Sequence, residues 1–307
     1  MKILLAIEEA AGIQTLKAVH QSEHEVVAVL TASSGEADNK RGATVAAVAQ
    51  NLGYDVWPAK RVKDPALAQL MQEKAVDILL NVHSLYIIHK EVVAAPKVGA
   101  FNLHPGPLPY YAGMNAPSWA ILNGEQQHGV TLHWMEAGID TGHIAYQARF
   151  DLKDTDTGLS VSTQCVRLGL DLIRQLLSTS PEAIPRLEQD FGKRHYYGFE
   201  VPFGGKLDWS KDALNLERFI RASDFYPLPS PWGTPKTCLE GKELGILKAS
   251  LSGQEAQAAA GTIKKEGDRV WVATATEWLE LKKLMFEGKP VSPADFFRGG
   301  EQLVSPE

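Results

Sequence analysis

The sequence predicts an α/β fold, with a doubly wound, mostly parallel sheet followed by a small β domain. Two patterns lead to this prediction. Over roughly the first 180 residues, short apolar runs alternate with stretches of helical periodicity, which is typical of parallel strands joined by crossover helices. After about residue 240, short strand-like runs follow one another with glycine-containing turns between them, as in antiparallel β structure.

The elements of the first part can be taken in chain order. Strands are expected at residues 2–7, 26–31, 54–57, 76–82, 99–104, 130–134 and 143–151. Helices are expected at residues 10–20, 43–52, 65–74, 117–123 and 159–177. Gly53 ends the second helix and Pro65 begins the third. Residues 33–40 form a polar loop, and periodicity alone places Tyr86, Ile87 and Ile88 on the packing face of a helix.

A break in composition separates the second part of the chain. Residues 201–207 are rich in Gly and Pro, residues 208–222 contain a helix pattern, and the four prolines of residues 225–235 exclude regular structure there. Short strands are expected at 244–247, 261–264, 269–273 and 279–284, with a closing helix at 291–297. We therefore expect a catalytic domain over 1–200, a linker and connecting helix over 201–235, and a small β domain over 236–307.

Composition limits the kind of protein. Hydrophobic residues make up 44% and charged residues 22% of the chain, which predicts a globular fold. The two cysteines, Cys165 and Cys238, have no metal-site or disulfide spacing, so a reducing cytoplasm is expected. The N-terminal MKILLAIEEA is interpreted as a first strand rather than a signal peptide, and no apolar run is long enough to span a membrane. The net charge of -6 argues against a large nonspecific nucleic-acid surface.

The stretch FNLHPGPLPYYAGMN, residues 101–115, is the first candidate site. Side chains alternate along a strand, so Asn102 and His104 project from the same face. Pro105 then ends the strand, at the edge of a parallel sheet where ligands bind. Taken alone, an Asn and a His at a strand end are more often structural than catalytic.

The second candidate is GVTLHWMEAGIDTG, residues 129–142, in which a strand runs into a glycine-bounded turn carrying Asp140. Asn102, His104 and Asp140 together could stabilise an oxyanion and transfer a proton. His128 and His133 lie on the strand pattern without a partner at metal-ligand spacing, and both are interpreted as structural. No G-x-G-x-x-G follows the first strand, so dinucleotide binding is not supported.

NLHPGPLPYYAG followed by GVTLHWMEAGIDTG resembles the folate-dependent formyltransferases, which include the methionyl-tRNA formyltransferases. Within this family, the residues of the motif are more similar to those of the aminosugar and secondary-metabolite enzymes. The resemblance implies a Rossmann-like catalytic domain, an OB-like C-terminal barrel, and Asn102, His104 and Asp140 as catalytic residues. It implies 10-formyltetrahydrofolate as formyl donor, an amine as acceptor, and no metal. The implied folate-binding residues are Tyr86, Ile87, Ile88, Met114, Glu136, Ala137, Gly138, Ile139 and Asp140.

The acceptor is the open question. A tRNA acceptor is disfavoured by the acidic charge balance and by the short, mixed-charge loop at residues 33–42. A small-molecule or carrier-bound primary amine, such as that of an aminosugar nucleotide, an amino acid or a biosynthetic intermediate, is favoured. The alternatives are a methionyl-tRNA formyltransferase, a 10-formyltetrahydrofolate hydrolase, and a non-catalytic folate-binding module. The oligomeric state is not predicted.

Overall fold

A computed structural model describes residues 1–32, 44–84 and 86–306 of the chain. These residues divide into two compact units. The first comprises Met1–Gly113, Gly129–Phe150 and Gln164–Tyr196, and the second comprises Met114–His128, Asp151–Thr163 and Tyr197–Glu307. The expected domain limits at residues 200 and 235 stay a prediction, and the expected loop at 33–40 lies outside the described residues.

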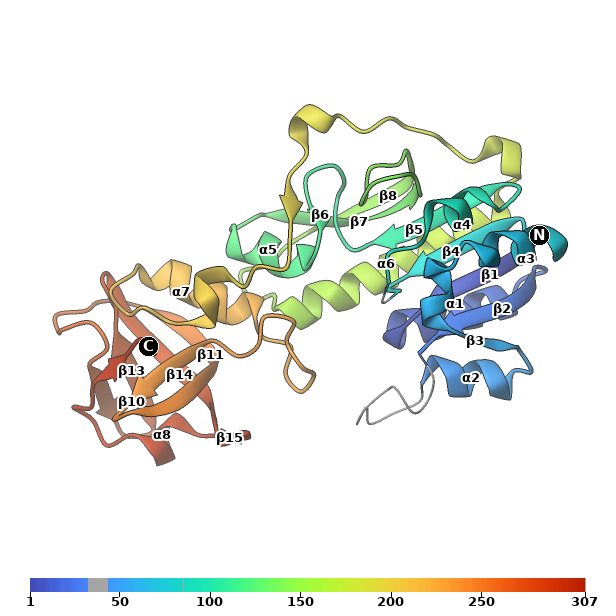
Figure 1. Ribbon diagram of the computed structural model, residues 1–307. Helices are drawn as coiled ribbons and strands as arrows, with labels where there is room; N and C mark the ends of the chain where they lie inside the picture. Colours follow the sequence, from blue (N-terminus) through green and yellow to red (C-terminus); the bar gives the residue numbers. More distant parts are fainter. Residues whose placement is uncertain (33–43, 85, 307) are drawn as a thin grey trace. The chain divides into compact units, whose positions relative to one another are not determined.

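The first unit is built on a seven-stranded sheet of order β3-β2-β1-β4-β5-β7-β8 (Figure 1). Its strands are β1 (Lys2–Ile7), β2 (Glu25–Thr31), β3 (Val56–Pro58), β4 (Ile78–Val82), β5 (Gly99–His104), β7 (Gln127–Trp134) and β8 (Ile144–Asp151). From β3 to β5 in this order, adjacent strands are parallel to each other, whereas β7 is antiparallel to β5. The predicted doubly wound, mostly parallel sheet is confirmed.

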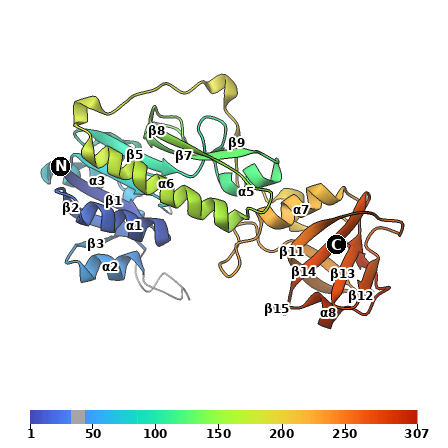
Figure 2. The ribbon, with the colours of Figure 1, turned by 180° about the vertical axis from the view of Figure 1, so that it is seen from behind.

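Helices cover both faces of this sheet (Figures 1 and 2). They are α1 (Glu9–His20), α2 (Val45–Asn51), α3 (Ala66–Glu73), α4 (Lys90–Ala94) and α6 (Gly158–Ser178), with the 3-10 turn η1 (Ala59–Lys63). Leu79 of β4 and Ala100 of β5 are buried in one core with Met71 of α3 and Val92 of α4. On the other face, the Cα of Gly169 in α6 lies so close to Leu103 that a Cβ would meet that side chain at 2.7 Å.

The interpretation of Tyr86–Ile88 as a helix face is wrong. The backbone at these residues is not helical, and α4 begins only at Lys90. The reason is His89, which has an extended backbone and accepts the Glu91 N–H through its own side chain, a capping contact that starts a helix. Tyr86–Ile88 therefore form part of the loop that leaves the carboxyl end of β4.

The second unit contains an antiparallel half-barrel of order β12-β13-β14-β11-β10-β16, with β15 paired to β14. Its strands are β10 (Lys236–Leu239), β11 (Lys242–Glu255), β12 (Ile263–Glu266), β13 (Arg269–Ala273), β14 (Glu277–Phe286), β15 (Lys289–Val291) and β16 (Leu303–Val304). Its helices are α5 (Ala116–Leu122), α7 (Ala213–Ala222) and α8 (Pro293–Phe296). Two-residue strands β6 (Ala112–Gly113) and β9 (Tyr196–Tyr197) pair with each other.

The sequence predicted fewer and shorter strands than this half-barrel contains. The strand expected at 244–247 is β11, which runs for 14 residues, and strands β10, β15 and β16 were not expected. Irregularities in the pairing of β11 with β14, between Ile246 and Lys248 and between Leu251 and Glu255, let the long strand bend while it stays paired. Such a strand loses strict alternation of apolar and polar residues, which is the signal by which strands are predicted.

Candidate active site

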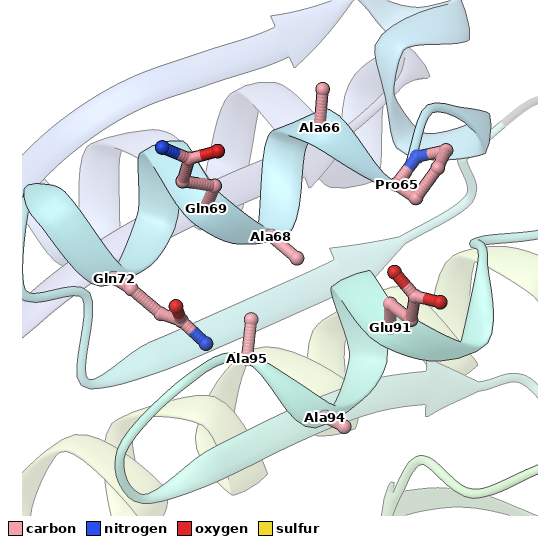
Figure 3. A pocket seen from close by; sticks show the side chains of 8 residues that line it. All are labelled: Pro65, Ala66, Ala68, Gln69, Gln72, Glu91, Ala94 and Ala95. Carbon is pink, nitrogen blue, oxygen red and sulfur yellow. The ribbon is translucent and has the colours of Figure 1, made fainter.

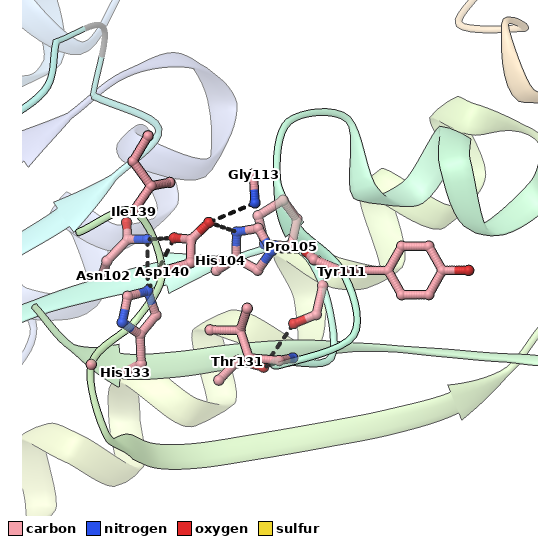
Figure 4. Close-up of polar contacts among 12 residues, drawn as sticks. Asn102, His104, Pro105, Tyr111, Gly113, Thr131, His133, Ile139 and Asp140 are labelled. Carbon is pink, nitrogen blue, oxygen red and sulfur yellow. Dashed lines mark hydrogen bonds and ion pairs between the residues drawn. The ribbon is translucent and has the colours of Figure 1, made fainter. Parts of the chain in front are cut away.

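Asn102 and His104 lie on one face of β5 at its carboxyl end (Figure 4). They continue the row that begins at Ala100, which is buried against the α3 and α4 layer. His104 is 4% exposed. The chain then leaves the sheet through a loop held by Thr131 of β7, whose hydroxyl donates to the Gly106 carbonyl at 2.7 Å and accepts from the Leu108 N–H at 3.1 Å.

Asp140 is brought to these two residues by the turn that follows β7. Its carboxylate Oδ2 accepts the Gly113 N–H at 2.8 Å and lies 3.5 Å from His104 Nδ1. Its Oδ1 lies 3.4 Å from Asn102 Nδ2. Asp140 has φ +54° and is 8% exposed, so its side chain is held inside the protein (Figure 4). The structure thus brings together the three residues that the sequence put forward as catalytic.

The buried cluster changes the acidity of both titratable partners. Burial alone would raise the pKa of Asp140, but the facing His104 and His133 rings and the Gly113 N–H outweigh it and hold that pKa below its usual range. Burial is the main reason why the pKa of His104 is lowered, against the opposing effects of Asp140 and the Tyr111 carbonyl. The cluster therefore favours an ionised Asp140 beside a neutral His104.

The contacts of His104 decide which ring nitrogen carries the proton. Its Nε2 lies 2.5 Å from the Tyr111 carbonyl oxygen, which can only accept, so Nε2 carries the hydrogen. The unprotonated Nδ1 then faces Asp140 Oδ2. A proton that arrives at Nδ1 would form an imidazolium beside a carboxylate, so the pair is arranged to accept a proton.

His133 is a residue of this cluster to which the sequence gave only a structural role. It lies opposite Asn102 in the antiparallel β5–β7 pair, and its Nε2 is 3.0 Å from Asn102 Nδ2 and 3.4 Å from Asp140 Oδ1. Its Nδ1 donates to the Trp134 carbonyl at 2.7 Å. The alternation of VTLHW places His133 on one face of its strand, but only knowledge that β7 pairs with β5 could have revealed the contact.

A segment distant in sequence holds the Asp140 turn from outside. Gln189 Nε2 donates to the carbonyls of Asp140 at 2.9 Å and Gly142 at 2.6 Å, and Arg194 Nη2 donates to the carbonyl of Ile139 at 3.0 Å. Gln189 is buried. No sequence signal near Gln189 or Arg194 indicated this role, because both act on backbone atoms about 50 residues away.

The predicted folate-binding residues after β4 have different surroundings. Ile87 is 76% exposed, whereas Ile88 is buried in the core under α3 and α4. Tyr86 packs against that core, with the Lys63 ammonium 4.5 Å from its ring centre. Among these three residues, Ile87 alone exposes most of its side chain.

The predicted residues of the Asp140 turn are largely exposed. Glu136 pairs with His143 at 2.8 Å, Ala137 and Gly138 lie at the surface, and the Ile139 side chain is 44% exposed. Met114 belongs to the second compact unit, where it is 39% exposed and its N–H donates to the Tyr197 carbonyl at 2.9 Å. The folate-binding role of all these residues stays a prediction.

A groove between α3 and α4 is a separate feature (Figure 3). It is lined by Pro65, Ala66, Ala68, Gln69, Gln72, Glu91, Ala94 and Ala95. None of these residues is one of the buried polar residues Asn102, His104, His133 and Asp140. Across the described ranges, no group of three His, Cys, Asp or Glu side chains is placed to hold a metal ion, and no helix is both long and apolar enough to cross a membrane.

Comparison with known proteins decides the family. The formyl transferase family model matches residues 1–175, and the model of the formyl transferase C-terminal domain matches residues 204–301. The chain belongs to the formyl transferase family. The resemblance seen in the two sequence motifs is confirmed, and the protein is an enzyme of this family.

Curated relatives match most or all of the chain at modest identity. The methionyl-tRNA formyltransferase of Dehalococcoides mccartyi is 32% identical over 262 residues, which cover 83% of this chain and 80% of that protein. Those of Alkaliphilus oremlandii and Solibacter usitatus are 26% and 28% identical and cover 94% and 100% of this chain, and 93% and 98% of their own lengths.

Solved structures share the fold. WlaRD, a sugar 3N-formyltransferase solved in the presence of dTDP and 5-N-formyl-THF, has a TM-score of 0.70 at 18% identity and covers 92% of this chain and 96% of its own. An N-formyltransferase from Helicobacter canadensis, solved with folinic acid and dTDP-3-aminofucose, has a TM-score of 0.67 at 18% identity, with 91% and 97% coverage. At this identity the likeness is one of fold.

Proposed function

We propose that the enzyme transfers a formyl group from 10-formyltetrahydrofolate to the primary amine of a small-molecule or carrier-bound acceptor. The observation that carries this proposal is the contact of one buried carboxylate, Asp140, with both Asn102 and His104. An amide donor and a proton-accepting imidazole that each lie within reach of one carboxylate are the groups that acyl transfer to an amine needs.

The formyl donor supplies the one-carbon group, and the residues of this chain handle charge and protons. When an amine attacks a formyl carbon, the formyl oxygen becomes negative and the amine nitrogen positive. One N–H of Asn102 Nδ2 faces His133 at 3.0 Å, and the other, which makes only the long 3.4 Å contact with Asp140, is the donor that can stabilise the negative oxygen. His104 Nδ1 can accept the proton of the amine, directly or through water, and Asp140 stabilises the resulting imidazolium. Collapse of the intermediate then breaks the bond between the formyl carbon and the donor nitrogen, which takes up the proton from His104, so no covalent link to the enzyme is required.

The choice of a reduced folate as donor has two supports. The WlaRD and Helicobacter canadensis proteins of the same fold were solved with formylated folates. In this chain, Ile87 and Ile139 present exposed apolar side chains on the loops that follow β4 and β7. Exposed apolar side chains on such loops suit a flat heterocycle that carries donors and acceptors at its edge.

The choice of a small or carrier-bound acceptor is supported by charge. The chain has a net charge of -6, and residues 236–307 contain ten Lys and Arg against eleven Asp and Glu. A protein that binds the phosphates of a nucleic acid needs a clear excess of basic side chains on one face. The loop at 33–42, which also argued against tRNA, lies outside the described residues.

A tRNA acceptor is the second candidate, because the curated relatives named above are methionyl-tRNA formyltransferases that match this chain over 80–98% of their own lengths. The deciding experiment compares initial rates of tetrahydrofolate release with 10-formyltetrahydrofolate and either charged initiator tRNA or a panel of amino sugars, amino acids and carrier-bound amino acids. Release that depends on a small amine supports the proposal. Efficient, salt-sensitive formylation of methionyl-tRNA overturns the acceptor choice.

Two controls separate the remaining alternatives. Formate production without any added amine would identify a hydrolase. Folate binding without turnover under all conditions would identify a non-catalytic module.

A further inference from the structure

Three polar side chains form a row across neighbouring strands on one face of the sheet. In register, Asn81 of β4 is the partner of Asn102 of β5, and Asn102 is the partner of His133 of β7. The side chains are also in contact. Asn81 Nδ2 donates to Asn102 Oδ1 at 2.8 Å, and Asn102 Nδ2 lies 3.0 Å from His133 Nε2.

The orientation of the Asn102 carboxamide follows from the groups that can only accept. Asp140 Oδ1 faces one end of this carboxamide, and an ionised carboxylate has no proton to give, so that end must be the NH2 group. The oxygen then faces Asn81, and Asn81 must present its own NH2 group to it. The opposite orientation of Asn102 would place its carboxamide oxygen against the Asp140 carboxylate and its NH2 group against the NH2 group of Asn81.

The His133 contacts agree with this orientation. Its Nδ1 faces the Trp134 carbonyl and therefore carries a hydrogen, so in the neutral ring Nε2 is free to accept from Asn102. At the other end of the row, Asn81 Oδ1 is buried and has no hydrogen-bond partner among the residues that the structure describes. Within those residues, the donation to Asn102 is thus the side-chain hydrogen bond that orients Asn81.

The geometry points to Asn81 as a positioning residue, which acts through Asn102 by keeping the NH2 group of that carboxamide toward Asp140. This inference rests on the proposed function, because it assigns Asn102 the donor role in formyl transfer. An Asn102 held the wrong way would offer an oxygen to the negative formyl oxygen and would repel it. Asn81 touches neither donor nor acceptor in this scheme, so it affects the rate and not the binding of the folate.

Two substitutions test the donor of Asn81. Asn81→Ala removes it, and Asn81→Asp keeps the shape but replaces the NH2 group by an oxygen. Each should lower kcat on the order of tenfold, with the KM for 10-formyltetrahydrofolate changed less than about twofold. A matched control is Gln127→Ala, which removes an exposed carboxamide that donates to Asp151 at 2.8 Å, and its kcat should be that of the wild type.

A double-mutant cycle shows whether Asn81 acts through Asn102. In an Asn102→Ala background, Asn81→Ala should cost less than about twofold in kcat, because the group it positions is gone. A merely structural Asn81 would lower the melting temperature in both backgrounds and leave kcat unchanged. Wild-type kcat in Asn81→Asp, or an undiminished loss in the Asn102→Ala background, overturns the inference.

A measurement on the wild-type protein does not depend on activity or on the folding of variants. With 15N labelling, the hydrogen bond from Asn102 Nδ2 to His133 Nε2 should give a scalar coupling between the two nitrogens in the NMR spectrum. Its absence overturns the orientation. If the coupling is present but no amine is formylated, the proposed function fails while the assigned orientation stands.

Discussion

His104 Nδ1 lies 3.5 Å from Asp140 Oδ2, and both side chains are less than one-tenth exposed. Because His104 donates through its other nitrogen to the Tyr111 carbonyl, the nitrogen that faces Asp140 is the one available to gain a proton. A carboxylate at this distance in a buried site stabilises the protonated ring more than it could in water. The pair is therefore arranged for the positive charge that develops during amine attack.

Asp140→Asn tests this pairing. The substitution keeps the shape of the side chain but removes the charge that stabilises protonated His104, so turnover should fall on the order of a hundredfold or more. Titration calorimetry with a reduced folate should give a nearly unchanged dissociation constant. The proposed catalytic role is wrong if the variant folds normally and retains a wild-type rate.

His104→Ala and Asn102→Ala should each lower turnover by a similar factor, on the order of a hundredfold. Because the three residues act as a unit, each double variant should lose much less than the product of its two single losses. Turnover and melting temperature are measured on the same samples. Lowered melting temperatures with normal turnover in the folded fraction would instead indicate purely structural residues.

The pH dependence of turnover follows from the lowered pKa of His104. The neutral ring is the competent form, and its pKa in the folded protein is depressed, so activity is present at neutral pH and is lost as the pH falls. The acid limb of kcat should lie below the ordinary histidine value of about 6.5. A kcat profile from about pH 5 to about pH 8 measures it, and an acid limb above the ordinary value would contradict the assignment.

Gly142→Ala should displace the Asp140 turn. A Cβ at Gly142 would lie 1.9 Å from the Trp134 carbonyl oxygen, a backbone atom that cannot move without disturbing β7. We expect a loss of about 1–3 kcal/mol in the free energy of unfolding, together with reduced turnover. Gly192→Ala is the control, since its nearest neighbour is the flexible Asp190 side chain at 3.2 Å. Equal stabilities in urea titrations of the two variants would refute this account of the turn.

A stability prediction concerns the half-barrel. Hydrogen bonds from Arg269 at 2.9 and 2.8 Å, with a further contact from Lys282, lower the pKa of the buried Glu280 to about 2. Glu280→Gln should therefore cost about 1 kcal/mol in the free energy of unfolding at neutral pH.

The sign of the pH effect distinguishes this pair from a packing defect. The stabilisation is present above the ordinary Glu pKa of about 4.3 and is lost as the pH falls toward about 2. The free energies of unfolding of the wild type and of Glu280→Gln should therefore converge in acid. Glu266→Gln removes an exposed partner of Lys264 and should change stability by less than about 0.5 kcal/mol. A difference that does not shrink in acid would exclude an ionic origin.

A formylated folate that does not transfer its formyl group should protect the enzyme against heat. A ligand that binds only the folded state, at a concentration of about 100 times its dissociation constant, stabilises it by about 2.7 kcal/mol. Differential scanning fluorimetry with 5-formyltetrahydrofolate measures the shift, and the Asp140→Asn variant should show it as well. No binding heat with any folate up to millimolar concentration would count against folate as the donor.

The sequence alone predicted the parallel sheet, because buried strands and crossover helices leave strong local periodicities. It also identified Asn102, His104 and Asp140 as candidates, because strand alternation and proline and glycine breaks are local features. The same two motifs indicated the family, and the match of the formyl transferase family model to residues 1–175 confirms it. The bent strand β11 and the end of the Tyr86–Ile88 loop at His89 were missed, because bulges and capping contacts weaken or override periodicity.

Only the tertiary structure decided which residues surround the three candidates. His133 and Asn81 reach Asn102 because β4, β5 and β7 are neighbours in one register, and strand order is not encoded in any single stretch of sequence. Gln189 reaches Asp140 through backbone carbonyls, which every residue carries and which leave no trace in residue type. The identity of the reacting groups is thus a local property of the chain, whereas their orientation and proton state arise from contacts between distant segments.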